Sequence, residues 1–333
     1  MSESTKGLTP MERLKKNDSV IVSEIKINAL TWLKDFRLTA DDLNEQVNYL
    51  IDDFLVEQTI TNIFAKAGHG KSFLALYLAL KLLDEKKITE CYYIDLDNSK
   101  KALQSRGLDK IVVKYENLNY VHRSKFKQAI EVVATIKQLL EQPQLKDLKG
   151  MLIVIDSVRD FLGGKDMLKD KDVIPLMDDL KTLREAGATI IFLHHANKEN
   201  GAKGATAFID SVDVAYQLKS IQLIKHQKIS YALEVKKDRI AVSNTGFELD
   251  TSTQILSAGN FDVANLNDEE MELIGTFKDI LEENTNGISQ SDLLKEAGTK
   301  SDNRQHRNLL KRMDGIFWKT YRGSKNALLY RSI

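Results

Sequence analysis

Short apolar segments alternate with longer helical ones between residues 59 and 195. The apolar segments are ITNIF, CYYIDLD, MLIVID and TIIFLHH, and the helical ones are SFLALYLALKLL, KQAIEVVATIKQLL and IPLMDDLKTLREAG. Strands that alternate with helices of this length are joined by crossover connections, which predicts an α/β fold with a mainly parallel sheet flanked by helices. MLIVI and TIIFL lack polar alternation, and this favours strands buried on both faces.

Three regions follow from the pattern along the chain. Residues 1–45 form a segment that is polar and flexible at its start, and mixed apolar spacing over 24–55 predicts short helices. We place the α/β domain at 46–262, where the shorter pieces VDVAYQL, ISYALEVK, TGFELD and QILSA predict antiparallel strands that complete the sheet. A small C-terminal domain then occupies 266–333.

The last domain has its own caps and turns. A helix containing Phe277 precedes ISQSDLLKEAG, in which Ser289 is the expected N-cap and Gly298 the expected C-cap. A third helix is predicted from its N-cap Ser301 to Gly315, and IFWKTYR with ALLYRSI predicts a β-hairpin. Three helices followed by a hairpin are the order of a winged helix, so we expect a winged-helix-like domain.

Composition excludes several classes of protein. No apolar run approaches the roughly 20 residues that cross a bilayer, and the amino terminus lacks the apolar stretch of a signal peptide. The single cysteine, Cys91, rules out an intramolecular disulfide and fits a reducing compartment. We therefore expect a cytoplasmic protein with no membrane association. The 48 basic residues balance the 48 acidic ones, which excludes a surface that is basic throughout.

Residues 65–72 read Ala-Lys-Ala-Gly-His-Gly-Lys-Ser and lie between the strand-like ITNIF and an apolar helix. Glycines let backbone N–H groups close around phosphate oxygens, and the helix presents the positive end of its dipole. Lys71 can then reach the β- and γ-phosphates, and Ser72 can ligate Mg²⁺. Ala65 replaces the glycine that usually opens a P-loop. The segment predicts nucleotide binding by Ala67, Gly68, His69, Gly70, Lys71, Ser72 and Phe73.

A carboxylate ends the apolar run MLIVID. Asp156 would lie at the carboxyl edge of a buried parallel strand, where ligands bind in open α/β sheets. There it can hold a water molecule bound to Mg²⁺. Together, Ser72 and Asp156 are the expected metal-binding residues.

Three further segments carry a resemblance to a known superfamily. YIDLD ends at Asp97, Arg106 follows nine residues later, and TIIFLHH ends at His195. With the phosphate loop, these segments make residues 50–250 resemble the RecA-like ATPases, most closely the RepA-type plasmid helicases and the helicase domain of DnaB-type proteins. The resemblance implies that Asp97 serves as the base that orients the attacking water, in place of the usual glutamate. It further implies that Arg106 lies against adenine and that His195 senses the γ-phosphate.

The same resemblance assigns DNA-contacting and subunit-bridging residues. SVRDFLGGKDMLK and ANKENGAKGATAF match the loops that line the central DNA channel, with Lys165, Lys198 and Lys203 as phosphate contacts. Lys237 and Arg239 resemble a pair that hexameric helicases insert into the neighbouring subunit's ATP site. Residues two apart on a strand point to one side, so both can approach one phosphate. The site would then be shared between subunits.

Charge is divided unevenly within the C-terminal domain. Residues 268–294 hold one basic and eight acidic residues, whereas 295–333 hold ten basic and three acidic ones. The basic part coincides with the expected recognition helix and wing, which favours DNA binding over the alternative of protein binding. The expected DNA contacts are Arg304, Arg307, Lys311, Lys319, Arg322 and Lys325.

These features together predict an ATP- and Mg²⁺-dependent hydrolase. We expect a DNA helicase or related replication protein that assembles as a homo-oligomeric ring, a hexamer, and moves on single-stranded DNA. Duplex DNA and other replication proteins are further expected partners. Two alternatives stay open: a recombinase or loader that forms nucleotide-dependent filaments, and a nucleotide-sensing DNA-binding regulator.

Overall fold

The computed structural model describes residues 34, 36–40, 46–125, 138, 141, 147–196, 204, 206–223, 227–323 and 328–333. All helices and strands given below lie in one compact unit, Asn48–Ile333. The helix predicted over 127–140 lies outside the described residues except at Gln138. Within the described ranges, no helix combines the length and apolar character needed to span a membrane.

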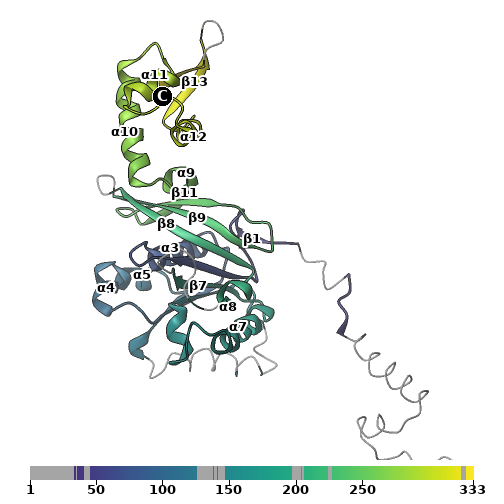
Figure 1. The fold of residues 1–333 in the computed structure, drawn as a ribbon. Coiled ribbons are helices and arrows are strands. Elements are labelled where there is room, and N and C mark those ends of the chain that lie inside the picture. The colour runs from purple at the N-terminus through teal and green to yellow at the C-terminus, as the bar shows by residue number, and fades with distance from the viewer. Residues whose placement is uncertain are drawn as a thin grey trace, which may run out of the picture. The chain divides into compact units, whose positions relative to one another are not determined.

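A sheet of nine strands forms the centre of the α/β domain (Figure 1). Its order is β11-β10-β9-β8-β3-β7-β6-β4-β5. The six strands from β8 to β5 are parallel, and β9, β10 and β11 extend the sheet antiparallel. The strands are β3 Ile60–Ala65, β4 Glu90–Asp95, β5 Leu118–His122, β6 Met151–Asp156, β7 Thr189–His195, β8 Val214–Leu223, β9 Lys228–Asp238, β10 Thr245–Asp250 and β11 Ile255–Gly259. The predicted α/β class and the antiparallel extension are both confirmed.

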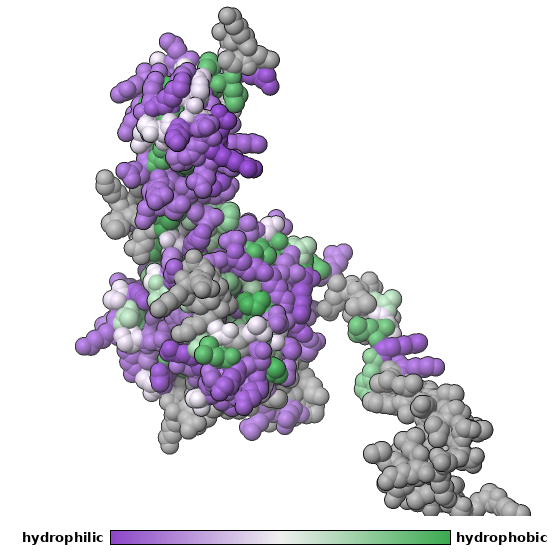
Figure 2. All heavy atoms as spheres, in the orientation of Figure 1, coloured by the Kyte–Doolittle hydropathy of each residue, from purple (hydrophilic) through white to green (hydrophobic). Residues whose placement is uncertain are grey.

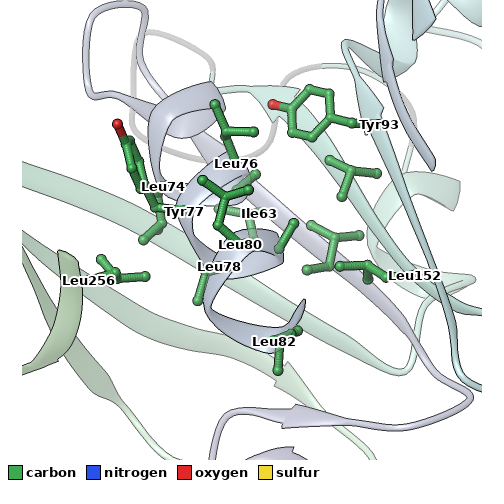
Figure 3. Close-up of a cluster of buried hydrophobic side chains, with 14 of the residues drawn as sticks. Ile63, Leu74, Leu76, Tyr77, Leu78, Leu80, Leu82, Tyr93, Leu152 and Leu256 are labelled. Atoms are coloured by element: carbon green, nitrogen blue, oxygen red, sulfur yellow. The ribbon is translucent and has the colours of Figure 1, made fainter. Parts of the chain in front are cut away.

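Helices cover both faces of this sheet. They are α3 Lys71–Asp84, α4 Lys100–Ser105, α5 Leu108–Lys114, α7 Asp170–Glu185 and α8 Ala207–Asp210, with 3-10 turns at Arg123–Lys125 and Val158–Leu162. Alternate residues of each strand enter different cores: Leu152 and Val154 pack with α3, whereas Ile153 and Ile155 pack with α7. Figure 3 shows the leucines of α3 beside Ile63 and Leu152. Burial on both faces explains why these strands lack polar alternation.

The segment before β3 differs from its prediction. Short helices were expected over 24–55, and most of 24–45 lies outside the described residues; at the end of this segment the described residues form instead an antiparallel pair, β1 Tyr49–Ile51 and β2 Leu55–Val56. Asp53 has a positive φ of 56° in the turn between them, and Phe54 N–H donates to the Ile51 carbonyl. Phe54 is fully buried against Tyr216, whose hydroxyl donates to the Phe54 carbonyl at 2.9 Å. The turn and this anchor override the mixed apolar spacing.

The C-terminal region folds around its own core. The helix α9 Phe261–Ala264, which packs on β8, β9 and β10, precedes it. The elements of this region are α10 Asp268–Glu283, β12 Ile288–Ser289, α11 Gln290–Glu296, α12 Arg304–Arg312, β13 Trp318–Arg322 and β14 Leu328–Ser332. The strands form a sheet in the order β12-β14-β13. Phe277, Leu293, Leu310 and Trp318 are buried in the shared core, and Trp318 Nε1 donates to the Leu310 carbonyl at 2.9 Å. The short strand β12 was not predicted.

One of the predicted caps in this region is confirmed, one is displaced by a residue, since Ala297 is the C-cap of α11, and one is wrong. Ser289 caps α11 by accepting from Asp292 N–H, and Gly298 follows the helix with a positive φ of 71°. Ser301 does not cap α12; Asn303 does, because its side-chain oxygen accepts from the N–H groups of Gln305 and His306. Both Ser and Asn are strong N-cap residues, so the local pattern left the start of this helix ambiguous.

Candidate functional site

The loop between β3 and α3 has the backbone of an anion-binding site. Gly68 and Gly70 have positive φ values of 85° and 71°, a conformation that glycine adopts without strain. Gly70 is the N-cap of α3, and the first turn of α3 contains no acidic residue. Free N–H groups and the positive end of a 14-residue helix therefore face the loop.

A cavity of about 430 Å³ lies over this loop and gathers residues from the loop itself, from the segments after β4 and α4, and from β6, β7, β8 and β9. Its volume is in the range of ligand pockets. Its lining includes Ala67, Gly68, Gly70, Lys71, Ser72, Phe73, Asp97, Asn98, Arg106, Asp156, His195, Ser220 and Ile229. The residues that the sequence assigned to phosphate, metal, adenine and γ-phosphate sensing thus share one cavity, with His69 the exception.

Lys71 lies under the loop with its side chain turned back to it. The residue is 8% exposed, and its Nζ donates to the carbonyls of Ala65 at 3.1 Å and Lys66 at 3.2 Å. Burial lowers the pKa of Lys71, whereas the nearby carboxylates of Asp156 and Asp97 raise it. The ammonium group therefore lies near two carboxylates. When a nucleotide binds, it can donate its hydrogen bonds to phosphate oxygens in place of the two backbone carbonyls.

Asp156 is the buried acid of the site. It is 2% exposed, and burial raises its pKa to about 6, while hydrogen bonds from Ser72 and Tyr93 act in the opposite direction. The Tyr93 hydroxyl lies 3.1 Å from Asp156 Oδ2 and 3.1 Å from the Ser72 carbonyl. The Ser72 hydroxyl contacts the Asp156 carboxylate, which places two oxygen ligands of the kind Mg²⁺ prefers side by side. Phosphate oxygens and water would supply the remaining ligands of such an ion.

A second buried acid, Asp95, was missed by the sequence analysis. It is fully buried at the end of β4, and it accepts hydrogen bonds from the N–H groups of Asp97 and Asn98, the Asn98 amide and the Tyr120 hydroxyl. Tyr120 stacks on Tyr93 with ring centroids 4.9 Å apart. Asp95 and Asp97 are two residues apart in YIDLD, and residues two apart on a strand point to the same side. This spacing is the one sequence signal that could have indicated that both acids belong to the site.

Asp97 lies beyond its strand, not on it. The sequence placed Asp97 at the strand end, but β4 ends at Asp95. Because Asp95 accepts the N–H groups of both Asp97 and Asn98, the chain turns there and leaves the ladder. Asp97 is consequently exposed in the cavity wall, facing the region over the phosphate loop.

Arg106 is held in the cavity wall by two contacts. Its Nη1 donates to Asn98 Oδ1 at 3.1 Å, and its guanidinium lies 5.4 Å from the centre of the Phe73 ring. A planar cation fixed over a ring provides a flat surface suited to stacking on a purine base.

The two histidines of the prediction differ in position. His195 is the last residue of β7, half buried, and lines the cavity. His69 is outside the cavity lining: its Nδ1 accepts from the N–H of Ser220 on β8 at 3.3 Å. Burial, then Lys71, Lys66 and Lys219, lower the pKa of His69, which keeps Nδ1 available as an acceptor. His69 thus makes an anchoring contact to β8, and its nucleotide-contacting role stays a prediction.

Lys237 and Arg239 lie together but away from the cavity. Lys237 Nζ donates to the carbonyls of Ile209 and Asp210, at 2.8 and 2.6 Å, and Arg239 Nη2 donates to the Asp210 carbonyl at 3.1 Å. Both side chains thus meet at the C-terminal end of α8, as expected for residues two apart. Burial and the adjacent Arg239 lower the pKa of Lys237.

The predicted DNA contacts are distributed over two regions. Lys165 is exposed after the 3-10 turn that follows β6. Lys198, Lys203 and Lys325 lie outside the described residues. In the C-terminal region, Arg304, Arg307, Lys311, Lys319 and Arg322 are all exposed. The first three of these share one face of α12, since they are three and four residues apart.

Comparison with known proteins agrees with this geometry. A family model described as an AAA domain matches residues 28–201, which is more than half of the chain. No curated protein matches the chain. The matched residues include the phosphate loop, Asp97, Asp156 and His195. The chain therefore belongs to the AAA domain family, and its α/β core is that of a nucleotide-dependent P-loop ATPase.

Proposed function

We propose that this ATPase is a DNA motor, a hexameric helicase-like replication protein that translocates on single-stranded DNA. The observation that carries the proposal is the location of Lys237 near the end of β9 and of Arg239 directly after it. Ile229, near the start of that strand, lines the phosphate cavity, whereas Lys237 lies eight residues further along. At about 3.3 Å per residue, this separates them by about 26 Å.

This separation means that Arg239 cannot reach the cavity of its own chain. The positive pair is instead held at the C-terminal end of α8, with Arg239 N–H bonded to the Asp213 carbonyl. A cation that completes a neighbour's site stabilises the charge of phosphoryl transfer, an effect of about 10³–10⁵ in rate in GTPases. We therefore propose a head-to-tail ring in which each cavity receives Lys237 and Arg239 of the next subunit.

The roles of the cavity residues follow from their positions. Lys71 would bind phosphate oxygens, Ser72 and Asp156 would hold Mg²⁺ and its water, and Arg106 would lie against adenine. Asp97 would orient the attacking water, and His195 would bind near the γ-phosphate. Bound Mg²⁺ would neutralise charge that develops on the phosphate oxygens.

A structural link joins the proposed sensor to the proposed DNA loops. His194, next to His195, packs against Phe208 of α8 with ring centroids 4.4 Å apart. A Cβ atom on Gly204 would lie 2.6 Å from the Met167 carbonyl, so Gly204, after β7, and Met167, after β6, are in close contact. This contact supports a role for both segments, and for Lys165, Lys198 and Lys203 on them, in one DNA-binding channel.

The C-terminal domain is proposed to be a winged helix that binds DNA. Its element order and its β12-β14-β13 sheet support that assignment. In Figure 2 the described surface of this region is mainly hydrophilic. Arg304, Arg307 and Lys311 would contact the duplex from α12, with Lys319, Arg322 and Lys325 on the wing.

A forked-duplex unwinding assay, with electron microscopy of the ATP-bound protein, tests this proposal. Rings together with ATP-dependent unwinding are the expected result. Filaments without unwinding would favour the recombinase or loader, and dimers that bind one DNA sequence tightly would favour the regulator. Either of these outcomes would overturn the motor.

A further inference from the structure

Tyr231, on β9, is a fully buried tyrosine whose hydroxyl has no hydrogen-bond partner among the described residues. A buried hydroxyl without a partner loses its hydration and gains nothing in return. Burial also raises the pKa of Tyr231, so the group stays a neutral donor.

The Tyr231 hydroxyl lies directly against the phosphate loop. A Cβ atom built on Gly70 would be 3.2 Å from both Cε1 and the hydroxyl oxygen of Tyr231. Gly70 is the N-cap of α3 and a wall of the nucleotide cavity. The loop therefore rests on the tyrosine ring, with only a glycine between the hydroxyl and the cavity.

A second contact anchors the loop at the same step of the sheet. Ser220 of β8 pairs with Tyr231 of β9, and the Ser220 N–H donates to His69 Nδ1. His69 and Gly70, which are consecutive in the loop, thus rest on two strand residues that face each other. If the loop changes its conformation, His69 and Gly70 must therefore shift against Ser220 and Tyr231.

From these contacts we propose that Tyr231 is a positioning residue for nucleotide binding. When the loop N–H groups turn toward phosphate, the attached carbonyls turn away from it, because the two groups of a peptide plane point in opposite directions. The Tyr231 hydroxyl then donates to a loop carbonyl and stabilises the nucleotide-bound arrangement. The inference rests on the proposed ATP site and adds a group that acts through the loop without touching the nucleotide.

The chain offers a matched control in Tyr216. It is also fully buried, on the neighbouring strand β8, but its hydroxyl has a partner, the Phe54 carbonyl at 2.9 Å. Each Tyr→Phe change removes one oxygen atom. Tyr216→Phe breaks an existing hydrogen bond, whereas Tyr231→Phe removes one that forms only with nucleotide.

The test uses the full chain, with Mg·ADP and Mg·ATP binding measured by calorimetry and melting followed with and without nucleotide. Tyr231→Phe should weaken the binding of both nucleotides about three- to tenfold, as expected for the loss of one hydrogen bond. It should not lower the melting temperature of the nucleotide-free protein. The KM for ATP should rise by more than kcat falls. Tyr216→Phe should lower the melting temperature without nucleotide and leave affinity unchanged.

Several results would overturn the inference. One is wild-type affinity in Tyr231→Phe; another is a loss confined to ATP, which would put the hydroxyl on the γ-phosphate. Misfolding or lower melting of nucleotide-free Tyr231→Phe would mean that the hydroxyl already has a partner. If the unaltered chain binds neither nucleotide, the proposed function fails as well, which distinguishes that failure from the failure of Tyr231 alone.

Discussion

The Tyr120 hydroxyl donates to Asp95 Oδ2 at 2.6 Å, and this bond holds Asp95 in place. The other oxygen of Asp95 accepts the N–H of Asp97 and so holds the turn that carries Asp97. Asp95 accepts only, so every neighbour in this cluster is arranged as a donor. The position of the proposed base, Asp97, is thus determined by a residue that does not line the cavity.

Replacing Asp95 tests this dependence. Asp95→Asn places an amide N–H₂ against existing donors, and we expect a loss of stability on the order of 1–3 kcal/mol and a fall in ATP turnover of about tenfold or more. Tyr120→Phe, which removes one donor and leaves the turn bonds, should cost about 0.5–1.5 kcal/mol with a smaller loss of turnover. Urea denaturation and steady-state kinetics measure both. Equal turnover of Asp95→Asn and wild type would contradict the positioning of Asp97 by Asp95.

Lys71→Ala removes the ammonium under the phosphate loop. We expect hydrolysis to fall to background, because no other described cation lines the cavity near the loop, Arg106 being held over Phe73. Lys81→Ala is the control, since Lys81 lies on the same helix and pairs with Glu85 on the surface. The measurement is the rate of phosphate release by the two variants. Unchanged turnover in Lys71→Ala would contradict the assignment of this cavity as the ATP site.

Charge removal on α12 tests the proposed DNA face. Arg304→Ala combined with Lys311→Ala should weaken DNA binding by the isolated full chain and reduce the slope of log affinity against log salt by about two. Lys278→Ala removes one positive charge from the acidic α10 and should leave both quantities nearly unchanged. Fluorescence anisotropy over a salt series provides the measurement. An unchanged slope in the double variant would favour protein binding by this domain.

Asp250 makes stability depend on acidity. Hydrogen bonds from the Ser252 hydroxyl and the N–H groups of Thr253 and Ser252 lower its pKa from 3.8 to about 2. A folded-state pKa below the unfolded value gives stability that is present above about pH 4 and is lost as the pH falls toward 2. Asp250→Asn should therefore be less stable than wild type at neutral pH and lose this difference by pH 2. Melting curves between pH 2 and 7 check this, and a difference that persisted at pH 2 would contradict it.

Some of these features were accessible from local sequence, and others depend on pairing between distant segments. The buried runs ending at Asp156 and His195 predicted strands, and the glycines before Lys71 predicted the loop, because each signal lies within a few residues. Tyr231 lies about 160 residues beyond Gly70, and only the β8–β9 register brings the two together. Asp95 was not predicted because the resemblance pointed to Asp97, although Asp95 is the buried acid of the two.

The central claim is that the ATP site is shared between subunits. Arg239→Ala and Lys71→Ala proteins, each inactive alone, should be mixed before assembly and assayed for ATP hydrolysis in the mixture. In a head-to-tail ring formed at random from equal amounts, about a quarter of the interfaces combine an intact loop with an intact arginine, so activity should recover toward about a quarter of wild type. No recovery, with mixed rings verified by mass measurement, would contradict the shared site.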